Sequence, residues 1–452
     1  MTAVTADTIC AAATPAGESA LAVVRISGPD TAAIATALAG SPPPPRRALR
    51  RDYHDASGAL VDDVVLTFLA GPGSYTGEDT LEISCHGSPF IVRRILGDLR
   101  ARGCRPAGPG EFTQRAFLNG RMDLSQAEAV MEVIRARGDR ALEVAQQQLR
   151  GGLGQRLQRL IDALLDTLAR IEAYIDFPDE DLPAEDKALV IRGLESILLD
   201  INRLSATSRY GDLLRDGIGT VILGAPNAGK SSLLNRLVGS DRALVSPEPG
   251  TTRDFLEEKV IIGPHCLRLI DTAGFNPSPT ALEGLGIAKT VERALGADLF
   301  ILVIDATAEA PALPEEVRAR LTPANTLVVL NKTDLEPTRE PALPWAAGRP
   351  PIRVSALTGT GLEALTHAIT SVCDKMTYDP SERVAINARH AGALQEAAES
   401  LLAARAKLGG AEASELIASD LRAALNALGE ITGRIDNERM LDRLFATFCI
   451  GK

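Results

Sequence analysis

The sequence predicts a multidomain protein of α/β and α class, in which an N-terminal α+β domain precedes a helical domain that is interrupted by an inserted α/β domain. Three observations support this prediction. Residues 8–103 alternate short apolar runs with helical runs, and from Ser125 the pattern changes to long helices. Helices of the same kind return after a different, α/β segment at 218–373. An insertion explains this order, because the two ends of an inserted domain lie close together.

The chain is long enough for several domains. Its 452 residues exceed what one hydrophobic core usually fills. We predict that residues 1–120 form the N-terminal α+β domain and 121–215 the first part of the helical domain. Residues 216–378 then form the inserted domain, and 379–452 form the second part of the helical domain, ending in FCIGK.

The N-terminal domain contains both strand-like and helix-like runs. The strand-like runs are TICAAAT, ALAVVRISG, DDVVLTFLAG and DTLEISCHG. The helix-like runs are DTAAIATALAG and the amphipathic PFIVRRILGDLRARG. The proline-rich stretch at 42–51 predicts a solvated connecting loop.

The helical domain is predicted from its caps and its leucine periodicity. The letters SQAE at 125–128 indicate a capping box, in which Glu128 returns a hydrogen bond to the backbone of the cap residue. A helical period of apolar residues runs through 149–171, and the glycines near its start are expected to interrupt it. The later helices are predicted at 388–409, 414–431 and 437–449.

Composition narrows the classes of function. A net charge of −11 argues against a protein that coats nucleic acid over its whole surface. Residues 91–121 are an exception, because seven arginines against Asp98 and Glu111 give a local excess of +5. A solvated helix face and an RNA-facing patch explain that excess equally well.

Cysteine spacing and hydropathy indicate a cytoplasmic protein. The six cysteines include no CxxC pair, which excludes a standard zinc knuckle and gives no disulfide framework. No run of about 18 apolar residues is present to span a membrane, and the N-terminal letters lack the basic start of a signal peptide.

The most specific signal is a phosphate-binding loop in the inserted segment. The letters GAPNAGKS, Gly224–Ser231, follow an apolar strand and precede a helix, which is the context that such a loop requires. Backbone N–H groups of the loop and of the helix N-terminus would surround the phosphates. Lys230 would reach the outer phosphates, and the Ser231 hydroxyl would bind magnesium.

Further motifs follow in the order that a GTP site requires. The run LRLIDTAG places Asp271 at a strand end, near the magnesium shell, and Gly274 where its amide can contact a terminal phosphate. The run TLVVLNKTDL supplies Asn331, Lys332 and Asp334, and VSAL follows at 354–357. The Asp334 carboxylate only accepts hydrogen bonds, which suits the two donors on the edge of guanine and mismatches adenine. GTP is therefore the predicted nucleotide.

A switch loop and an unusual residue lie between these motifs. In PGTTRD, at 249–254, we expect Thr252 rather than Thr251 to bind magnesium. Phe275 follows Gly274 where a Ras-like protein has the glutamine that orients the attacking water. Phenylalanine cannot orient water, so another group must do so, and a cation from elsewhere must neutralise the transition state.

These motifs together resemble those of the MnmE (TrmE) family of tRNA-modifying GTPases from end to end. The resemblance is carried by TGEDTLEISCHG, PGEFTQRAFLNGRMDLSQAEAV, AYIDFPDED, GAPNAGKSSLLN, GTTRD, DTAG, LGEITG and FCIGK. It implies a folate-binding and dimerising N-terminal domain, a helical domain and an inserted P-loop (Ras-like) GTPase domain that dimerises when GTP and potassium are bound.

The resemblance also implies partners and cofactors. Such proteins work with an FAD-dependent partner, MnmG, in a heterotetramer or larger complex. Together they place an aminomethyl-type group on C5 of the wobble uridine of certain tRNAs. The cofactors would be GTP, magnesium, potassium and a tetrahydrofolate derivative, in its 5,10-methylene or 5-formyl form, which would carry the one-carbon unit.

The resemblance assigns roles to particular residues. Glu283 matches the glutamate that orients the attacking water indirectly. Magnesium would be held by Ser231 and Thr252, potassium by Asn227, Ser246, Glu248 and Thr251, and folate by Arg25, Glu82, Arg121 and Lys452. The predicted GTP site comprises Asn227, Ala228, Gly229, Lys230, Ser231, Ser232, Ser246, Thr251, Thr252, Asp271, Thr272, Ala273, Gly274, Asn331, Lys332, Asp334, Ser355 and Ala356.

Two positions depart from the family pattern. The potassium loop reads SPEPG, with Pro247 and Pro249, which leaves the geometry of that loop open. Asn276 stands where an arginine is common, and this leaves the detail of the second switch open.

The sequence leaves more than one role open for the residues predicted to bind folate and for the chain end. Arg25 shares a strand face with Leu21 and Val23, so an edge-strand arginine that extends to solvent is the alternative to a folate ligand. Glu82 could likewise be a surface residue.

Cys449 falls on one helical face with Leu441 and Phe445, which predicts a buried packing residue. In a family member the same tail would form a wall of the folate pocket, and the thiol would be a candidate nucleophile.

Other functions also stay open. The chain could be a GTP-dependent switch or ribosome-assembly GTPase without its own role in RNA modification, or a structural dimer whose GTPase gates assembly. Assembly factors of that kind often carry a KH-like RNA module after the GTPase domain, whereas this tail is helical and has no GxxG clamp.

Overall fold

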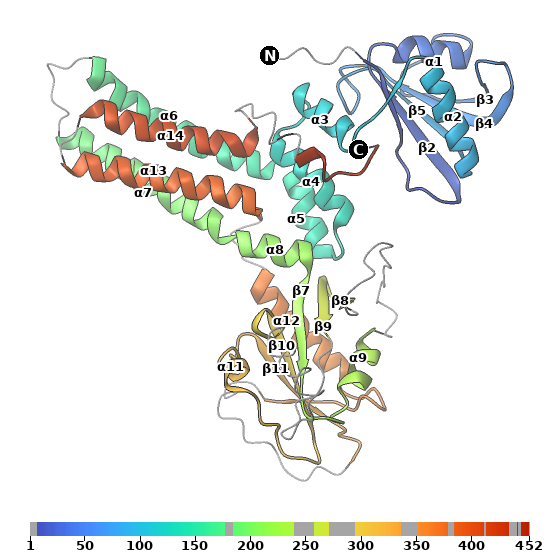
Figure 1. The fold of residues 1–452 in the computed structure, drawn as a ribbon. Coiled ribbons are helices and arrows are strands. Elements are labelled where there is room, and N and C mark those ends of the chain that lie inside the picture. Colours follow the sequence, from blue (N-terminus) through green and yellow to red (C-terminus); the bar gives the residue numbers. More distant parts are fainter. Residues whose placement is uncertain are drawn as a thin grey trace, which may run out of the picture. The chain divides into compact units, whose positions relative to one another are not determined.

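The computed structural model describes the residues 7–176, 184–238, 257–270, 294–335, 350–377, 384–410, 413–433, 441 and 444–451 (Figure 1). The chain forms two compact units, each described by itself. One comprises Met1–Met131, Leu153–Gln158 and Asn426–Lys452, and the other comprises Glu132–Gly152 and Arg159–Leu425. The domain boundaries predicted above stay predictions.

The first unit is built on a six-stranded sheet with the order β3-β4-β5-β2-β1-β6. Its pairs are antiparallel except for β1 with β6, which is parallel. The strands are β1 Ile9–Ala12, β2 Ser19–Ser27, β3 Ala48–His54, β4 Leu60–Leu69, β5 Thr80–Gly87 and β6 Arg105–Pro106. The helices that begin in this unit are α1 Thr31–Ala39, α2 Pro89–Ala101, α3 Glu111–Leu118 and α4 Leu124–Arg135. The predicted α+β class is confirmed.

The two faces of this sheet have different partners. One face packs against α1 and α2, and its core includes Val24, Ile83, Ile34 and Leu99. The other carries a smaller cluster of Ile9, Ala11, Ala107 and Phe112, against which Tyr75 packs. Because successive side chains of a strand point to opposite faces, β1 contributes Cys10 to the first core and its neighbours to the second.

A buried arginine holds the segment before β1 to the loops of this unit. The Arg115 side chain is only 4% exposed and forms ion pairs with Asp7 (2.7 Å), Glu111 (3.1 Å) and Glu78 (3.2 Å). Arg105 also pairs with Asp7, at 2.6 Å. The hydrogen bond from Arg105, with a further one from Arg115, lowers the pKa of Asp7 to about 2 although burial opposes this.

The start of α4 corrects one prediction. The capping box expected at 125–128 lies two residues earlier: the Asp123 side chain accepts a hydrogen bond from the backbone N–H of Gln126 (2.8 Å). The Gln126 side chain in turn accepts one from the backbone N–H of Asp123 (3.0 Å). Ser125 is fully buried and donates to Asp123. The helix begins at Leu124, so Ser125 already lies inside it and cannot be its cap.

The chain end corrects a second prediction, that of a helix over 437–449. Among the described residues of this segment Leu441, Leu444 and Phe445 are helical, and the chain leaves the helix in a turn after Phe445. Phe448, rather than Cys449, occupies the buried position, with its ring 5.3 Å from that of Phe445. Cys449 is exposed, so the expectation of a buried packing thiol is wrong.

The second unit contains long helices and the inserted α/β segment. The helices are α5 Asp139–Leu149, α6 Gly152–Asp176, α7 Ala184–Ala206, α8 Ser208–Asp216, α13 Ala388–Gly410 and α14 Ser414–Thr432, of which α6 and α14 extend into the first unit. Gly151, with φ of 85°, breaks the apolar period between α5 and α6 as predicted. In Figure 1, α6 lies beside α14 and α7 beside α13, and Arg422 pairs with Glu172 across the first pair of helices.

The inserted segment forms a six-stranded sheet with the order β12-β11-β10-β7-β9-β8. All pairs are parallel except β8 with β9. Its elements are β7 Ile218–Leu223, α9 Lys230–Val238, β8 Glu257–Ile262, β9 His265–Ile270, β10 Leu299–Asp305, α11 Glu315–Arg318, β11 Thr326–Asn331, β12 Ile352–Arg353 and α12 Leu362–Thr377. Apolar cores cover both faces of the sheet, which explains why β7 and β11 are buried throughout.

No helix in the described parts of the chain is both long enough and apolar enough to cross a membrane.

We predict that Arg115→Met destabilises the first unit by about 3–5 kcal/mol, because three carboxylates would lose a buried cationic partner. Native-state hydrogen exchange of the amides in β2 and β5 measures this locally. Arg50→Met is the matched control: Arg50 pairs with Asp63 but its side chain is 79% exposed, so little change is expected. If the two variants behave alike, the buried network does not stabilise this unit.

Candidate functional site

The loops that follow the parallel strands of the inserted domain form one candidate site. The carboxyl ends of parallel strands meet at one edge of a sheet, where ligands of such folds bind. The phosphate loop follows β7, Asp305 ends β10, Asn331 ends β11 and Ser355 follows β12. The register pairs Asp305 directly with Asn331. Motifs that are distant in the sequence therefore meet at this edge.

The phosphate loop has a shape that its glycines make possible. A Cβ atom on Gly224 would lie 2.3 Å from the carbonyl oxygen of Val303, and one on Gly229 would lie 2.2 Å from Nδ2 of Asn331. Gly229 also has a φ of 89°, which favours glycine. Asn227 is exposed and adopts a φ of 61°, which asparagine tolerates better than most residues.

Lys230, the first residue of α9, is held within this loop. Its Nζ donates hydrogen bonds to the carbonyl oxygens of Ala225 (2.8 Å) and Gly224 (3.2 Å), and the residue is 9% exposed. Ser231 and Ser232 follow on the first turn of α9 and are exposed. The Lys230 ammonium group and the N-terminus of α9 therefore lie together, and this arrangement is one that binds phosphate groups.

Asn331 joins the phosphate loop to the loop after β12. This residue is 2% exposed, and its Nδ2 donates to the carbonyl oxygen of Ala228 (2.9 Å). Its Oδ1 accepts from the backbone N–H of Ala356 (2.9 Å). The Asp334 carboxylate accepts a hydrogen bond from the Ser355 hydroxyl at 2.6 Å. The structure thus brings together both groups of residues predicted to contact the base.

Asp305 belongs to this edge but was not predicted as a site residue. Its carboxylate lies 2.6 Å from the amine of Lys332, which has a φ of 64°. Burial raises the pKa of Asp305, but hydrogen bonds from Lys332 and Thr307 outweigh it and leave the pKa below its usual range. The sequence contains a sign of this residue's position: the run LFILVID has the apolar pattern of a buried strand, and its last residue is Asp305.

Several predicted site residues lie outside the described part of the chain. They are Ser246, Glu248, Thr251, Thr252, Asp271, Thr272, Ala273, Gly274, Glu283 and Lys452. The predicted roles of these residues stay predictions.

A second candidate site surrounds Arg25 in the first unit. Arg25 on β2 and Glu82 on β5 are direct cross-strand partners, and Glu82 Oε1 accepts from Nη2 (2.8 Å) and Nε (3.1 Å) of the guanidinium. The Arg25 side chain is 16% exposed. Because β2 lies between β5 and β1, the alternative of an edge-strand arginine reaching to solvent is wrong.

Two aromatic rings lie near the Arg25 guanidinium, and Arg25, Glu82, Tyr75 and Phe112 are called the arginine pocket here. The guanidinium carbon of Arg25 lies 5.8 Å from the ring centre of Tyr75 and 5.7 Å from that of Phe112, within cation–π range. Burial raises the pKa of Tyr75, whose hydroxyl shares a hydrogen bond with Thr113. Neither ring was predicted, although Phe112 lies within the family motif PGEFTQRAFLNGR.

The chain end also contacts Arg25. Nη1 of Arg25 lies 3.4 Å from the carbonyl oxygen of Gly451, and the backbone N–H of Gly110 donates to the carbonyl oxygen of Cys449 (3.2 Å). Gly451 has a φ of 93°, and a Cβ there would lie 2.2 Å from the carbonyl oxygen of Ala12. The end of the described chain therefore packs against β1.

Arg121, the remaining described residue of the predicted folate set, lies by the loop between β4 and β5. A Cβ on Gly77 would lie 3.3 Å from Cγ of Arg121. The same loop carries Tyr75, whose ring faces Arg25. Arg121 therefore packs on the loop that supplies Tyr75 to the arginine pocket, and its predicted contact with folate stays a prediction.

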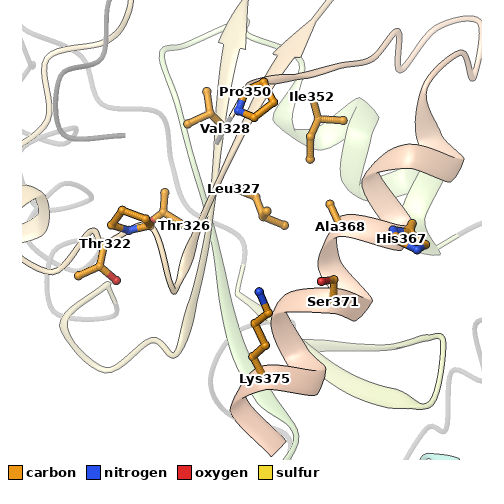
Figure 2. A pocket seen from close by; sticks show the side chains of 11 residues that line it. Thr322, Thr326, Leu327, Val328, Pro350, Ile352, His367, Ala368, Ser371 and Lys375 are labelled. Atoms are coloured by element: carbon orange, nitrogen blue, oxygen red, sulfur yellow. The ribbon is translucent and has the colours of Figure 1, made fainter. Parts of the chain in front are cut away.

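A cavity of about 330 Å³ lies elsewhere in the inserted domain (Figure 2). Thr326, the first residue of β11, lines it together with Ser371 and Lys375 of α12. The amino ends of parallel strands lie at the edge opposite to their carboxyl ends. None of the predicted site residues lines this cavity, so it is separate from the nucleotide loops.

The parallel sheet, the glycine loop before α9 and the Asn-Lys-x-Asp strand end define a P-loop GTPase domain. Comparison with known proteins extends this to the whole chain. Residues 8–121 match the family model described as GTP-binding protein TrmE N-terminus, and residues 124–449 match the one described as MnmE helical domain. The chain belongs to the MnmE family of tRNA modification GTPases.

Curated relatives agree over nearly the full length. The chain is 57% identical to a tRNA modification GTPase MnmE from Opitutus terrae, over 99% of both chains. It is 43% identical to that of Symbiobacterium thermophilum, again over 99% of both chains. For Akkermansia muciniphila the identity is 45%, over 98% of this chain and 99% of the relative.

We expect Asp334→Asn to weaken GTP binding by about 1.5–3 kcal/mol, because the proposed acceptor of guanine's donors loses its charge. An asparagine amide can donate, so binding of xanthosine triphosphate, which carries an oxygen where guanine has its amino group, should improve. Titration with both nucleotides measures the effect. Glu316→Gln, which neutralises an exposed acid on α11, is the control and should leave both affinities unchanged. Unchanged GTP affinity in Asp334→Asn would contradict the role.

Proposed function

We propose that this protein is a potassium-stimulated GTPase that modifies C5 of the wobble uridine of certain tRNAs, together with an FAD-dependent partner and a folate one-carbon unit. The observation that carries the proposal is the presence of two built sites in one chain of this family. One is the edge of the parallel sheet around Lys230 and Asn331. The other is the arginine pocket, which the chain end contacts.

The described residues fit the proposed GTP ligand. Lys230 and the N-terminus of α9 supply positive charge for phosphates, and Asn331 fixes the spacing between the phosphate loop and the base loop. Ser231 on the first turn of α9 is exposed and would hold magnesium. Bound magnesium and potassium would supply charge neutralisation for phosphoryl transfer.

Asn227 is the described residue best placed to hold potassium. It lies in the phosphate loop, and its side chain is exposed rather than used in a core contact. An amide oxygen is a suitable ligand for such a cation, and a cation beside the phosphates can act where an arginine finger would otherwise act. Ser246, Glu248 and Thr251 would complete this site, and Glu283 would orient the attacking water.

The arginine pocket fits a planar ligand that carries polar edges and carboxylates, as folate does. Arg25, Tyr75 and Phe112 provide a cation between two rings, and Glu82 provides an acceptor. Arg121 and Lys452 would add positive charge. In the cell the protein would act as a cytoplasmic homodimer, joined to its partner in a heterotetramer or larger complex.

We predict that GTP hydrolysis is faster in potassium than in sodium by on the order of tenfold or more, at matched ionic strength. Asn227→Gly should remove the difference without strain, because glycine accepts the positive φ at this position. Asn235→Ala, an exposed asparagine on α9, is the control and should keep it. Equal turnover of the parent in both salts would exclude a functional potassium site.

We expect deletion of residues 449–452 to abolish wobble-uridine modification while potassium-stimulated GTP hydrolysis continues, because the deletion removes the chain end that contacts the arginine pocket and leaves the nucleotide loops in place. Nucleoside analysis of tRNA from a strain lacking the gene, complemented with each variant, measures this. The same strain complemented with the parent chain tests the proposed function itself: uridines that stay unmodified there would refute it.

Cys449→Ser separates chemistry from packing in the same assay. Since Cys449 is exposed, serine should cost little stability, and a loss of modification would indicate a reacting thiol. Normal modification in this variant would remove the catalytic proposal for the thiol. Normal modification in the deletion variant would remove the role of the chain end as well.

A further inference from the structure

A groove of about 540 Å³ runs beside the arginine pocket in the first unit. One side of it is a single face of α2, which includes Val92, Arg93, Leu96 and Arg100. These positions follow the spacing of i, i+1, i+4 and i+8, so the groove extends along most of the helix. Its other lining residues are mainly small and apolar, and they include the exposed Ile450.

The charge of this groove is positive and uncompensated. Of the seven arginines in 91–121, Arg94, Arg102, Arg105 and Arg115 pair with acids of the same unit. Arg93 and Arg100 form no ion pair among the described residues, and the Nε of Arg100 donates to the carbonyl oxygen of Leu96. Both side chains line the groove, and no described acidic residue does. The arginine-rich segment thus places two arginines without a described ion pair along the groove.

The groove and the arginine pocket meet at the chain end and at β1. Ile450 lines the groove, and the carbonyl oxygen of the next residue, Gly451, lies 3.4 Å from Nη1 of Arg25. Ala11 also lines the groove, and it is the direct cross-strand partner of Arg25. Arg25 faces Tyr75 and Phe112, on the side of the sheet away from α2. A ligand held at Arg25 would therefore enter the groove by passing around β1, beside the chain end.

We propose that the groove binds the oligo-γ-glutamate tail of a folate whose ring system occupies the arginine pocket. This inference rests on the proposed folate function. Such a tail is a flexible chain with one free carboxylate at each added glutamate and methylene groups between them. Arginine is the best side-chain donor to carboxylates, and the apolar lining residues can cover the methylene groups.

The spacing of the two arginines suits a ligand that carries more than one carboxylate. Arg93 and Arg100 are seven residues apart on α2, which is a rise of about 10 Å. Two carboxylates of one extended tail can each meet an arginine, and the tail would then lie along the helix axis.

The test compares two probes, the monoglutamate and the pentaglutamate of 5-formyltetrahydrofolate, by isothermal titration calorimetry with the full-length chain. We expect the pentaglutamate to bind about tenfold more tightly at low salt, and this advantage should shrink as ionic strength rises. In the double variant Arg93→Gln with Arg100→Gln, the advantage should fall to about twofold or less while monoglutamate affinity is kept. Arg47→Gln, an exposed arginine outside the groove, is the control and should keep the full advantage.

The outcomes separate this inference from the proposed function. Tight binding of both probes with equal affinity would overturn the groove and leave the folate pocket standing. Binding of neither probe would overturn both. A tail-length advantage that survives in the double variant would place the tail elsewhere and overturn the proposal.

A second copy of the chain is the alternative occupant of the groove. Analytical ultracentrifugation of the parent and the double variant tests it. A shift of the monomer–dimer equilibrium in the double variant, without a tail-length effect in the parent, would overturn the proposal in favour of a protein interface.

Discussion

The buried side-chain amide of Asn331 is the interaction on which the nucleotide site depends. It donates to the phosphate loop at Ala228 and accepts from the base loop at Ala356, with both distances at 2.9 Å. Two loops that follow different strands are thereby held at one spacing. The same contact explains why position 229 requires glycine, because any Cβ there would collide with the side-chain amide of Asn331. One strand end therefore fixes the shape of the phosphate loop as well as the position of the base loop.

Local patterns in the sequence indicated where the loops of this site lie, since the described motifs stand at the ends of buried strands. Asn331 ends β11 after the apolar letters LVVL and Asp334 follows that strand, and a parallel sheet brings such strand ends to one edge. Asp305 obeys the same rule at the end of β10 and could have been found by it. What local pattern could not supply is the strand order. Arg25 has the same neighbours on an edge strand as on an inner one, and only the pairing of β2 with both β5 and β1 decides between them.

Two errors arose where a local pattern in the sequence fits more than one structure and a contact decides between them. The apolar spacing of Leu441 and Phe445 continues to Cys449, but the helix ends because the following residues pair with the segment before α3. At α4, both SQAE and the earlier DLSQ match a capping pattern. Only DLSQ places its cap residue, Asp123, outside the helix, where the backbone of a cap residue can adopt non-helical angles.

The hairpin of β8 and β9 shows how the nucleotide site is attached to the rest of the second unit. β9 ends directly before Asp271, and the turn between the strands packs on two helices. The carbonyl oxygen of Pro264 accepts from the backbone N–H of Arg140 (3.2 Å), and His265 lies 2.8 Å from the Asp374 carboxylate of α12. A Cβ on Gly138, just before α5, would lie 2.7 Å from the carbonyl oxygen of Pro264, so the helix and the turn are already in close contact. Burial lowers the pKa of His265 although Asp374 opposes this, which favours a neutral ring in the packed turn.

A tightly packed contact transmits displacement rather than absorbing it. A hairpin that is six residues long on each strand therefore connects the strand end before Asp271 to α5 through packed contacts.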